Sequence, residues 1–216
     1  SDAEFIRDAY STGLIDGVTT NPSLMLKAGK DPREVLKEIS DIFPFHASVS
    51  AEVVGDSVEE MLEMADDYIE IGPNITIKVP LTPEGLKVCK ELSDDDVAVN
   101  VTLCFSTAQA ILAAKAGAAY VSPFVGRVYD QSFDGLKLIE EITDVYATHK
   151  QKTEVLAASI RDVHQVASCF RVGADICTIP AKIFSGMYKH ILTDQGVEKF
   201  NDDWSKLCLL YTSPSP

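Results

Sequence analysis

Lys78 is the residue with the most reactive setting, because this lysine interrupts the apolar run Ile75-Thr76-Ile77-Lys78-Val79-Pro80. The run is rich in β-branched residues and ends in proline, which predicts a buried β-strand. Burial disfavours an ammonium ion, so a buried lysine has a lowered pKa and an amine that is free to attack a carbonyl carbon. The sequence therefore offers a Schiff-base nucleophile. The alternative is a lysine at the strand edge whose amino group reaches water.

Isolated polar side chains recur at the ends of the neighbouring predicted strands. Taken singly, each has an ordinary explanation, as a turn residue, a surface arginine or a partner of nearby backbone groups. In a barrel of parallel strands, however, the carboxyl ends of the strands share one side, where chemistry takes place. Polar residues with unrelated structural roles would not all lie at the carboxyl ends of the strands, so we interpret the set as one site. It comprises Thr19, Asn21, Glu52, Asn100, Thr102, Ser122, Arg127, Ser159 and Arg161.

The residue types in this set fit the chemistry of a ketose phosphate. A buried lysine forms an imine with a ketone, and Glu52 supplies a carboxylate that moves protons while the carbinolamine forms and dehydrates. The amides of Asn21 and Asn100 offer hydrogen bonds to sugar hydroxyls. The guanidinium groups of Arg127 and Arg161 offer charge-assisted hydrogen bonds to a terminal phosphate.

The elements that must position these residues alternate between strand-like and helix-like segments. This alternation predicts a parallel sheet with helices on its faces, and the absence of a GxGxxG motif argues against a dinucleotide-binding fold. The predicted strands are Gly17–Thr20, Ala47–Val54, Ile75–Val79, Val97–Thr102, Tyr120–Phe124, Glu154–Ala158 and Ile176–Pro180. The predicted helices are Pro32–Ile42, Ser57–Ile71, Pro83–Leu92, Ser106–Ala116, Asp134–Thr148, Asp162–Val172, Ala181–Tyr188 and Gly196–Lys206.

Seven predicted strands indicate an α/β fold, a (β/α)8 TIM barrel that lacks its first strand. The sequence opens on a helix that Ser1 or Asp2 would cap, so we expect the missing strand, about six residues long, to precede residue 1. We expect a single barrel domain over residues 1–206, with Gly196–Lys206 as an extra C-terminal helix. Residues 207–216 change abruptly to a Ser/Pro tail, which we interpret as extraneous or disordered.

Composition narrows the class of protein. The chain of 216 residues is 46% hydrophobic with a net charge of -14, which is typical of a globular protein and argues against general binding to nucleic acid or anionic membranes. No apolar run has the length of a transmembrane helix. The five cysteines lack CxxC spacing and are scattered through apolar segments, which indicates reduced core thiols in a cytoplasmic protein. The four histidines form no short-spaced cluster, so we predict no metal site.

Five segments of the chain resemble transaldolases, particularly the short transaldolases close to fructose-6-phosphate aldolase. They are GVTTNPSL (17–24), IKVP (77–80), NVT (100–102), SPFVGR (122–127) and AASIR (157–161). The similarity covers residues 1–206. It implies a barrel enzyme of the pentose phosphate pathway that moves a dihydroxyacetone unit between sugar phosphates. The donors would be sedoheptulose 7-phosphate or fructose 6-phosphate, and the acceptors glyceraldehyde 3-phosphate or erythrose 4-phosphate.

The resemblance also implies a role for each site residue. Lys78 would form the Schiff base, Glu52 would act as acid and base through a water molecule, and Thr102 would help to hold that water. Asn21 and Asn100 would bind the three-carbon unit. No metal or organic cofactor is implied, because the lysine imine is itself the electron sink. Arg127, Ser159 and Arg161 would hold the phosphate, and Thr19, Ser122 and Phe124 would line the substrate.

Two positions bear on the choice between close relatives. The aldolase branch carries Gln where this chain has Glu52, and Tyr where it has Phe124. The tyrosine hydroxyl helps to position a water for the release of free dihydroxyacetone, and an apolar Phe124 provides no such hydrogen bond. Both positions therefore favour a transaldolase. The alternatives are a fructose-6-phosphate aldolase and an inactive fragment that only binds sugar phosphates.

One catalytic residue of the family has no counterpart in the sequence. An aspartate on the first strand of these enzymes acts at the C4 hydroxyl during carbon–carbon cleavage, and we expect this chain to begin after that strand. Asp8, on the opening helix, and Asp16, at the opposite pole, do not replace it. The resemblance further implies a homo-oligomer, a pentamer or decamer. Phe200 and Trp204 of the last helix would then pack either on a neighbouring subunit or on their own barrel.

Overall fold

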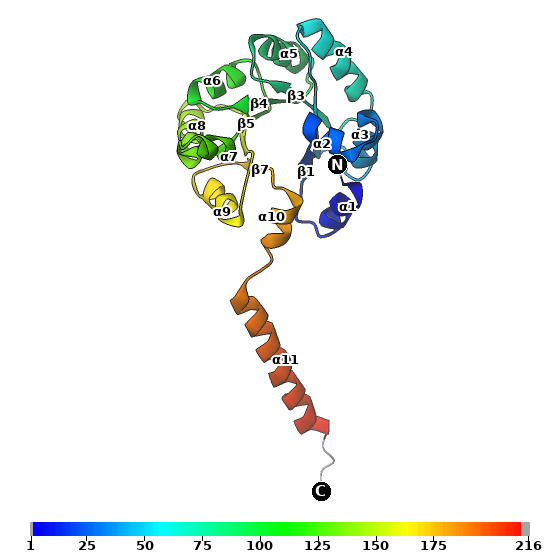
Figure 1. Cartoon of the computed structure of the whole chain (residues 1–216), viewed down its shortest axis with the longest axis vertical. Coiled ribbons are helices and arrows are strands. Elements are labelled where there is room, and N and C mark those ends of the chain that lie inside the picture. The colour runs from blue at the N-terminus through cyan, green and yellow to red at the C-terminus, as the bar shows by residue number, and fades with distance from the viewer. Residues whose placement is uncertain (1, 213–216) are drawn as a thin grey trace. The chain divides into compact units, whose positions relative to one another are not determined.

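The fold is seen in a computed structural model that describes residues 2–212. The chain forms two compact units, Ser1–Ile179 and Pro180–Pro216. In the first unit, seven parallel strands form one curled sheet in the order β1-β2-β3-β4-β5-β6-β7, and helices lie around its outside (Figure 1). This architecture confirms the prediction of an incomplete (β/α)8 barrel.

The strands of the sheet follow one another in chain order. They are β1 (Gly17–Thr19), β2 (Ser48–Glu52), β3 (Ile75–Pro80), β4 (Val99–Cys104), β5 (Tyr120–Pro123), β6 (Glu154–Ala157) and β7 (Ile176–Cys177). All seven predicted strands are present. Several are shorter than predicted because apolar residues continue past the last paired position, as Val54 does after β2, where it is already exposed.

The helices of the first unit begin at well-defined caps. They are α1 (Ala3–Ser11), α2 (Pro22–Ala28), α3 (Pro32–Ser40), α4 (Val58–Ile69), α5 (Pro83–Asp94), α6 (Thr107–Lys115), α7 (Val125–Asp130), α8 (Gly135–His149) and α9 (Val163–Arg171). Asp2 caps α1, as predicted, by accepting the N–H of Phe5. Two short helices, α2 and α7, were not predicted, because neither is long enough to show a helical period.

Alternation along β2 separates the packed layer from the interior. Val49 and Ala51 are fully buried and belong to the layer between the sheet and the helices. Ser48 and Ser50, which alternate with them along the strand, form hydrogen bonds with polar side chains of other strands, to Thr76 at 2.8 Å and Asn100 at 3.3 Å. The strands therefore turn apolar residues toward the helices and polar residues toward the middle of the sheet's curve.

The two edge strands of the sheet are β1 and β7. They approach each other at the carboxyl end of β1, where the hydroxyls of Thr19 and Thr178 lie 2.6 Å apart. Thr178 directly follows β7, and its own N–H donates to the carbonyl of Ala157 in β6. A side-chain hydrogen bond thus links the two edges.

The described residues of the second unit form the helices α10 (Ala181–Gly186) and α11 (Ile191–Thr212). The prediction ended the last helix at Lys206 and began it at Gly196, a residue that is unfavourable inside a helix by about 1 kcal/mol. The structure instead includes Gly196 in α11 and continues the helix to Thr212. The predicted tail over 207–216 is therefore helical as far as Thr212, and residues 213–216 lie outside the described residues. The single domain over 1–206 stays a prediction.

No helix among residues 2–212 is both long and apolar enough to cross a membrane. Cys89, Cys104, Cys169 and Cys177 are free thiols; the first three are buried as predicted, and Cys177 is partly exposed. Burial raises the pKa of the Cys89 and Cys104 thiols to about 12, so both remain protonated at neutral pH. Cys208 departs from the prediction of a core thiol because it is exposed.

Candidate active site

Glu52, Lys78 and Asn100 form a row across the middle of the sheet. The register of β2 on β3 pairs Glu52 with Lys78, and the register of β3 on β4 pairs Lys78 with Asn100. Residues paired in adjacent parallel strands point to the same face of the sheet. The sequence-predicted nucleophile, carboxylate and amide therefore share the interior face.

Lys78 is buried, with 7% of its side chain exposed, and its amino group has two oxygen partners. It donates to the Glu52 carboxylate at 2.7 Å and to the backbone carbonyl of Thr20 at 3.3 Å. The alternative of a strand-edge lysine in water is therefore wrong. Glu52 is itself mostly buried, with 12% of its side chain exposed. Removing two charges from water costs several kcal/mol per ion, and such pairs persist where they serve chemistry or specificity.

A chain of hydrogen bonds fixes the amide of Asn100. The Ser122 hydroxyl donates to Asn100 Oδ1 at 2.7 Å, and Asn100 Nδ2 donates to the Ser50 hydroxyl at 3.3 Å. All three side chains are buried. Sequence reasoning missed Ser50, although its position two residues before Glu52 on the same strand was a signal, because alternate residues share a face.

The Thr102 hydroxyl is the one buried side-chain oxygen without a hydrogen-bond partner among the described residues. An unpaired buried hydroxyl is costly, and ordered water satisfies most such groups. Thr102 lies two residues beyond Asn100 on β4 and pairs in register with Pro80, two residues beyond Lys78. Its position fits a water molecule held near the lysine.

The two arginines of the predicted phosphate site come from adjacent βα loops. Arg127, in the short helix α7, lies with its guanidinium carbon 4.8 Å from the centre of the Phe124 ring. Phe124 also contacts Phe105, which follows β4, at a centroid distance of 5.6 Å. Phe124 thus forms an apolar support for Arg127.

Backbone hydrogen bonds join α7 to the loop after β6, which carries Ser159 and Arg161. The N–H of Val125 donates to the Ala158 carbonyl at 3.0 Å, and that of Gly126 to the Ser159 carbonyl at 3.1 Å. Ser159 adopts a left-handed conformation with φ of 60°, which is strained for a residue other than glycine. Such strain concentrates at functional sites, and here it directs the loop toward α7.

Thr19 and Asn21 are held by local contacts. The Thr19 hydroxyl meets Thr178, and Asn21 Oδ1 accepts the N–H of Leu24 as the cap of α2. Between them, the carbonyl of Thr20 reaches Lys78. The structure therefore brings the Thr19–Asn21 loop to the lysine through its backbone, and it does not join the Thr19 and Asn21 side chains to Lys78 by a described hydrogen bond.

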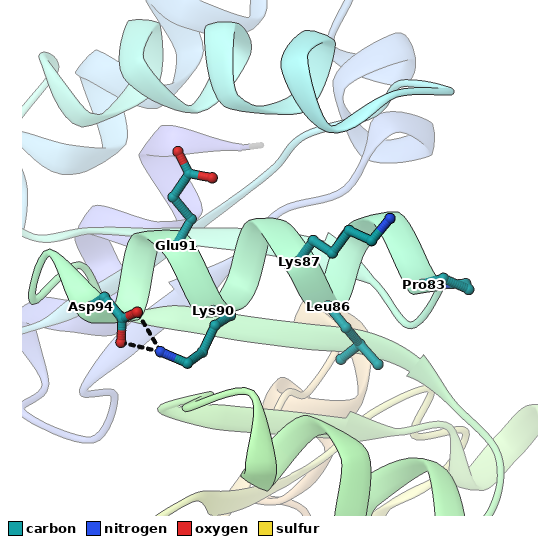
Figure 2. A pocket seen from close by; sticks show the side chains of 6 residues that line it. All are labelled: Pro83, Leu86, Lys87, Lys90, Glu91 and Asp94. Carbon is teal, nitrogen blue, oxygen red and sulfur yellow. Dashed lines mark hydrogen bonds and ion pairs between the residues drawn. The ribbon is translucent and has the colours of Figure 1, made fainter.

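A pocket of about 420 Å³ opens beside Glu52, between α2, α3 and α4. Thr20, Asn21 and Glu52 form its polar wall, and residues such as Met25, Leu36 and Met64 form its apolar wall. A separate hollow of about 540 Å³ lies along the outer surface of α5, where Lys90 forms an ion pair with Asp94 (Figure 2). It contains no residue of the predicted site.

The described side chains of the interior can support imine chemistry. Within residues 2–212, no group of three or more His, Cys, Asp or Glu side chains is arranged to hold a metal ion. What the interior does hold is an amine in direct contact with a carboxylate, a combination that activates a nucleophile for attack on a carbonyl. Arg127 and Arg161 follow β5 and β6, the next two strands along the sheet.

Comparisons with known proteins agree with this arrangement. Residues 1–210 match the family described as transaldolase/fructose-6-phosphate aldolase. Proteins of Paracoccus denitrificans and Cereibacter sphaeroides, each named probable transaldolase, are 51% and 52% identical over 206 residues, covering 95% of this chain and 94% and 93% of their own. A probable transaldolase of Caulobacter vibrioides is 48% identical over 205 residues, covering 95% of this chain and 94% of its own. The chain therefore belongs to the transaldolase/fructose-6-phosphate aldolase family of enzymes.

Proposed function

We propose that this protein transfers a dihydroxyacetone unit between sugar phosphates through an imine on Lys78. The observation that carries the proposal is the 2.7 Å contact between Lys78 Nζ and Glu52 in a buried row of the sheet. The donor would be sedoheptulose 7-phosphate or fructose 6-phosphate, and the acceptor glyceraldehyde 3-phosphate or erythrose 4-phosphate. These substrates rest on the sequence motifs and on the family.

Imine formation begins with proton transfer from Lys78 to Glu52. The neutral amine then attacks the C2 carbonyl of the ketose, and the carbinolamine loses its hydroxyl as water after a proton returns from Glu52. A water bound at the unpartnered Thr102 hydroxyl would extend the reach of the carboxylate between these positions. Asn100, which is fixed by Ser50 and Ser122, would orient the hydroxyls of the three-carbon unit.

The phosphate of the substrate would bind at Arg127 and Arg161. A guanidinium group pairs with phosphate oxygens through several N–H groups at once, which sets direction as well as affinity. The apolar Phe124 next to Arg127 offers no hydroxyl for a hydrolytic water. The three-carbon unit would therefore remain on Lys78 until an aldehyde acceptor arrives.

The proposal is tested by trapping the imine. Incubation with fructose 6-phosphate and borohydride is expected to add a reduced three-carbon unit to the intact protein, and peptide mapping is expected to locate it on Lys78. This adduct requires that a base other than the first-strand aspartate of the family take the proton of the C4 hydroxyl. A six-carbon adduct would limit the activity to imine formation without cleavage. The absence of any adduct, with fructose 6-phosphate still bound, would instead favour a sugar-phosphate-binding protein.

A product assay separates a transaldolase from a fructose-6-phosphate aldolase. With fructose 6-phosphate alone, we expect at most one equivalent of three-carbon unit per active site, because transfer requires an acceptor. Adding erythrose 4-phosphate should start steady formation of sedoheptulose 7-phosphate. Steady release of free dihydroxyacetone without an acceptor would contradict the proposal and favour the aldolase.

The proposal extends to the setting of the enzyme. Free cysteines support a reducing compartment such as the cytoplasm, where the pentose phosphate pathway operates. The resemblance to short transaldolases supports a pentamer or decamer. Phe200 and Trp204, four residues apart and thus on one face of α11, are the residues we would expect at the subunit contact.

A further inference from the structure

We propose that Asp130 is a positioning residue that orients Arg161 for the phosphate of the substrate. The inference rests on the proposed function, since it concerns the residue that would bind the phosphate. Neither the motifs of the sequence nor the predicted site includes Asp130. The inference rests on the hydrogen bond and the close packing that hold the Arg161 side chain against α7.

The end of the Arg161 side chain is held by Asp130. Arg161 Nη2 donates to Asp130 Oδ2 at 2.7 Å, which joins the loop after β6 to the last residue of α7. The distance is that of a charge-assisted hydrogen bond. The pair is about half exposed, and exposed ion pairs contribute little to stability. The pair therefore contributes more to the orientation of the Arg161 guanidinium than to the stability of the fold.

The middle of the Arg161 side chain crosses α7 at Gly126. A β-carbon at Gly126 would lie 2.5 Å from Arg161 Nε, 2.9 Å from its Cγ and 2.1 Å from the Ser159 carbonyl oxygen. Only a glycine leaves room for the arginine there. Asp130 follows Gly126 by four residues and so lies on the same face of the helix. The Arg161 side chain therefore extends along α7, passing close to Gly126 and ending at Asp130.

The backbone of Arg161 is fixed from the other side, by α9. Its N–H donates to Gln165 Oε1 at 2.9 Å, and the N–H of Gln165 is in turn held by the cap residue Asp162. Both ends of the arginine are therefore anchored, the backbone by α9 and the guanidinium by α7. A long side chain held in this way loses less conformational freedom when it binds a ligand.

A guanidinium has five N–H groups, and Asp130 engages Nη2 alone, which leaves donors for a phosphate. Arg127 projects from the same short helix as Asp130. Two arginines that bind one phosphate repel each other, and a carboxylate paired with one of them reduces this repulsion when no phosphate is bound. Asp130 also repels a phosphate, so its removal has two opposing effects. We expect the loss of orientation to dominate, because water screens exposed charges while hydrogen-bond geometry depends on direction.

The test compares Asp130→Ala with Asp130→Asn and with a matched control, Asp94→Ala, which removes the partner of Lys90 on the outer surface of α5. For Asp130→Ala we expect KM for fructose 6-phosphate to rise about 5-fold, and inhibition by inorganic phosphate to weaken by about the same factor, with kcat within about 2-fold. Activity with unphosphorylated fructose should not change. Asp130→Asn, which keeps an acceptor oxygen, should recover most of the loss, and Asp94→Ala should behave as wild type.

An unchanged or lower KM for fructose 6-phosphate in Asp130→Ala would overturn the inference while leaving the proposed function intact. So would an equal loss with fructose and fructose 6-phosphate, which would indicate a structural effect. Binding of inorganic phosphate, followed by calorimetry, provides a readout that does not depend on catalysis. Weaker phosphate binding by Asp130→Ala than by wild type would support the inference even if no imine forms. Equal binding by the two proteins would overturn it.

Discussion

Replacement of Lys78 by methionine is expected to abolish the borohydride-trapped adduct with fructose 6-phosphate and to reduce transaldolase activity below about one-thousandth of the wild-type value. The thioether of methionine fills nearly the same space as the lysine chain but has no nucleophilic nitrogen. The measurement is intact mass after trapping, combined with a coupled assay for erythrose 4-phosphate as acceptor. Circular dichroism should stay unchanged at 25 °C.

The stability of this variant must be followed, because the change leaves Glu52 without its cation. Removing one partner of a buried ion pair costs roughly 3–5 kcal/mol, so we expect a lower Tm. A second variant, Lys78→Arg, keeps a positive charge beside Glu52 but cannot form an imine, since a guanidinium stays protonated. It should also lack the adduct. The matched control is Lys90→Met, which removes a lysine from an exposed pair (Figure 2). An adduct that persists in both Lys78 variants would identify another lysine as the nucleophile.

The fold was predictable because nearly every strand is marked in the sequence by a run of apolar and β-branched residues. β3 and β4 are rich in apolar and β-branched residues and are buried almost throughout, as expected for strands covered on both faces, and each is followed by a capped helix. The predictions erred where a local signal was weak or misleading. The short helices α2 and α7 span too few residues to show a period, although Pro22 after Asn21 marks a helix start. Gly196 was read as a helix boundary and is part of the helix interior.

The residues of the candidate site were predictable from the end of each strand, but the contacts between these residues were not. Strand ends identify Glu52, Lys78 and Asn100, but register alone decides which of them meet, and register depends on the whole sheet. The bond from the Thr20 carbonyl to Lys78 had no signal in the sequence, since it involves a backbone oxygen. The hydrogen bond between Arg161 and Asp130 joins the loop after β6 to the end of α7, and only the fold brings these two segments together.

These contacts divide the site into two parts with separate tasks. The buried part, around Lys78, excludes water from an amine and a carboxylate, which strengthens their interaction and suits proton transfer. The exposed part, around Arg127 and Arg161, faces solvent, where a phosphate arrives already hydrated. Changes in the buried part should therefore alter kcat, and changes in the exposed part should alter KM for phosphorylated substrates.

Replacement of Glu52 by glutamine should lower kcat by about 100-fold while leaving KM within a few-fold, because general acid–base catalysis contributes 10²–10⁴-fold in typical enzymes. The amide keeps the size of the carboxylate and an oxygen that accepts a hydrogen bond from Lys78, but it neither takes up nor returns a proton. Rapid-quench trapping with borohydride is expected to show slow formation of the adduct with an undiminished final yield. The matched control is Glu60→Gln, which makes the same change at an exposed carboxylate at the start of α4.

The time course distinguishes a proton carrier from a purely electrostatic partner. If Glu52 only held the Lys78 ammonium in place, glutamine would change the adduct yield and the Tm together. If Glu52 carries the proton that the carbinolamine needs to lose water, the yield persists and the rate of adduct formation falls, because attack is still possible while dehydration is slow. A variant within threefold of the wild-type rate would remove Glu52 from the proton-transfer steps. The role would then have to pass to a group that reaches the imine independently, with Thr102 and its water as the next position to change.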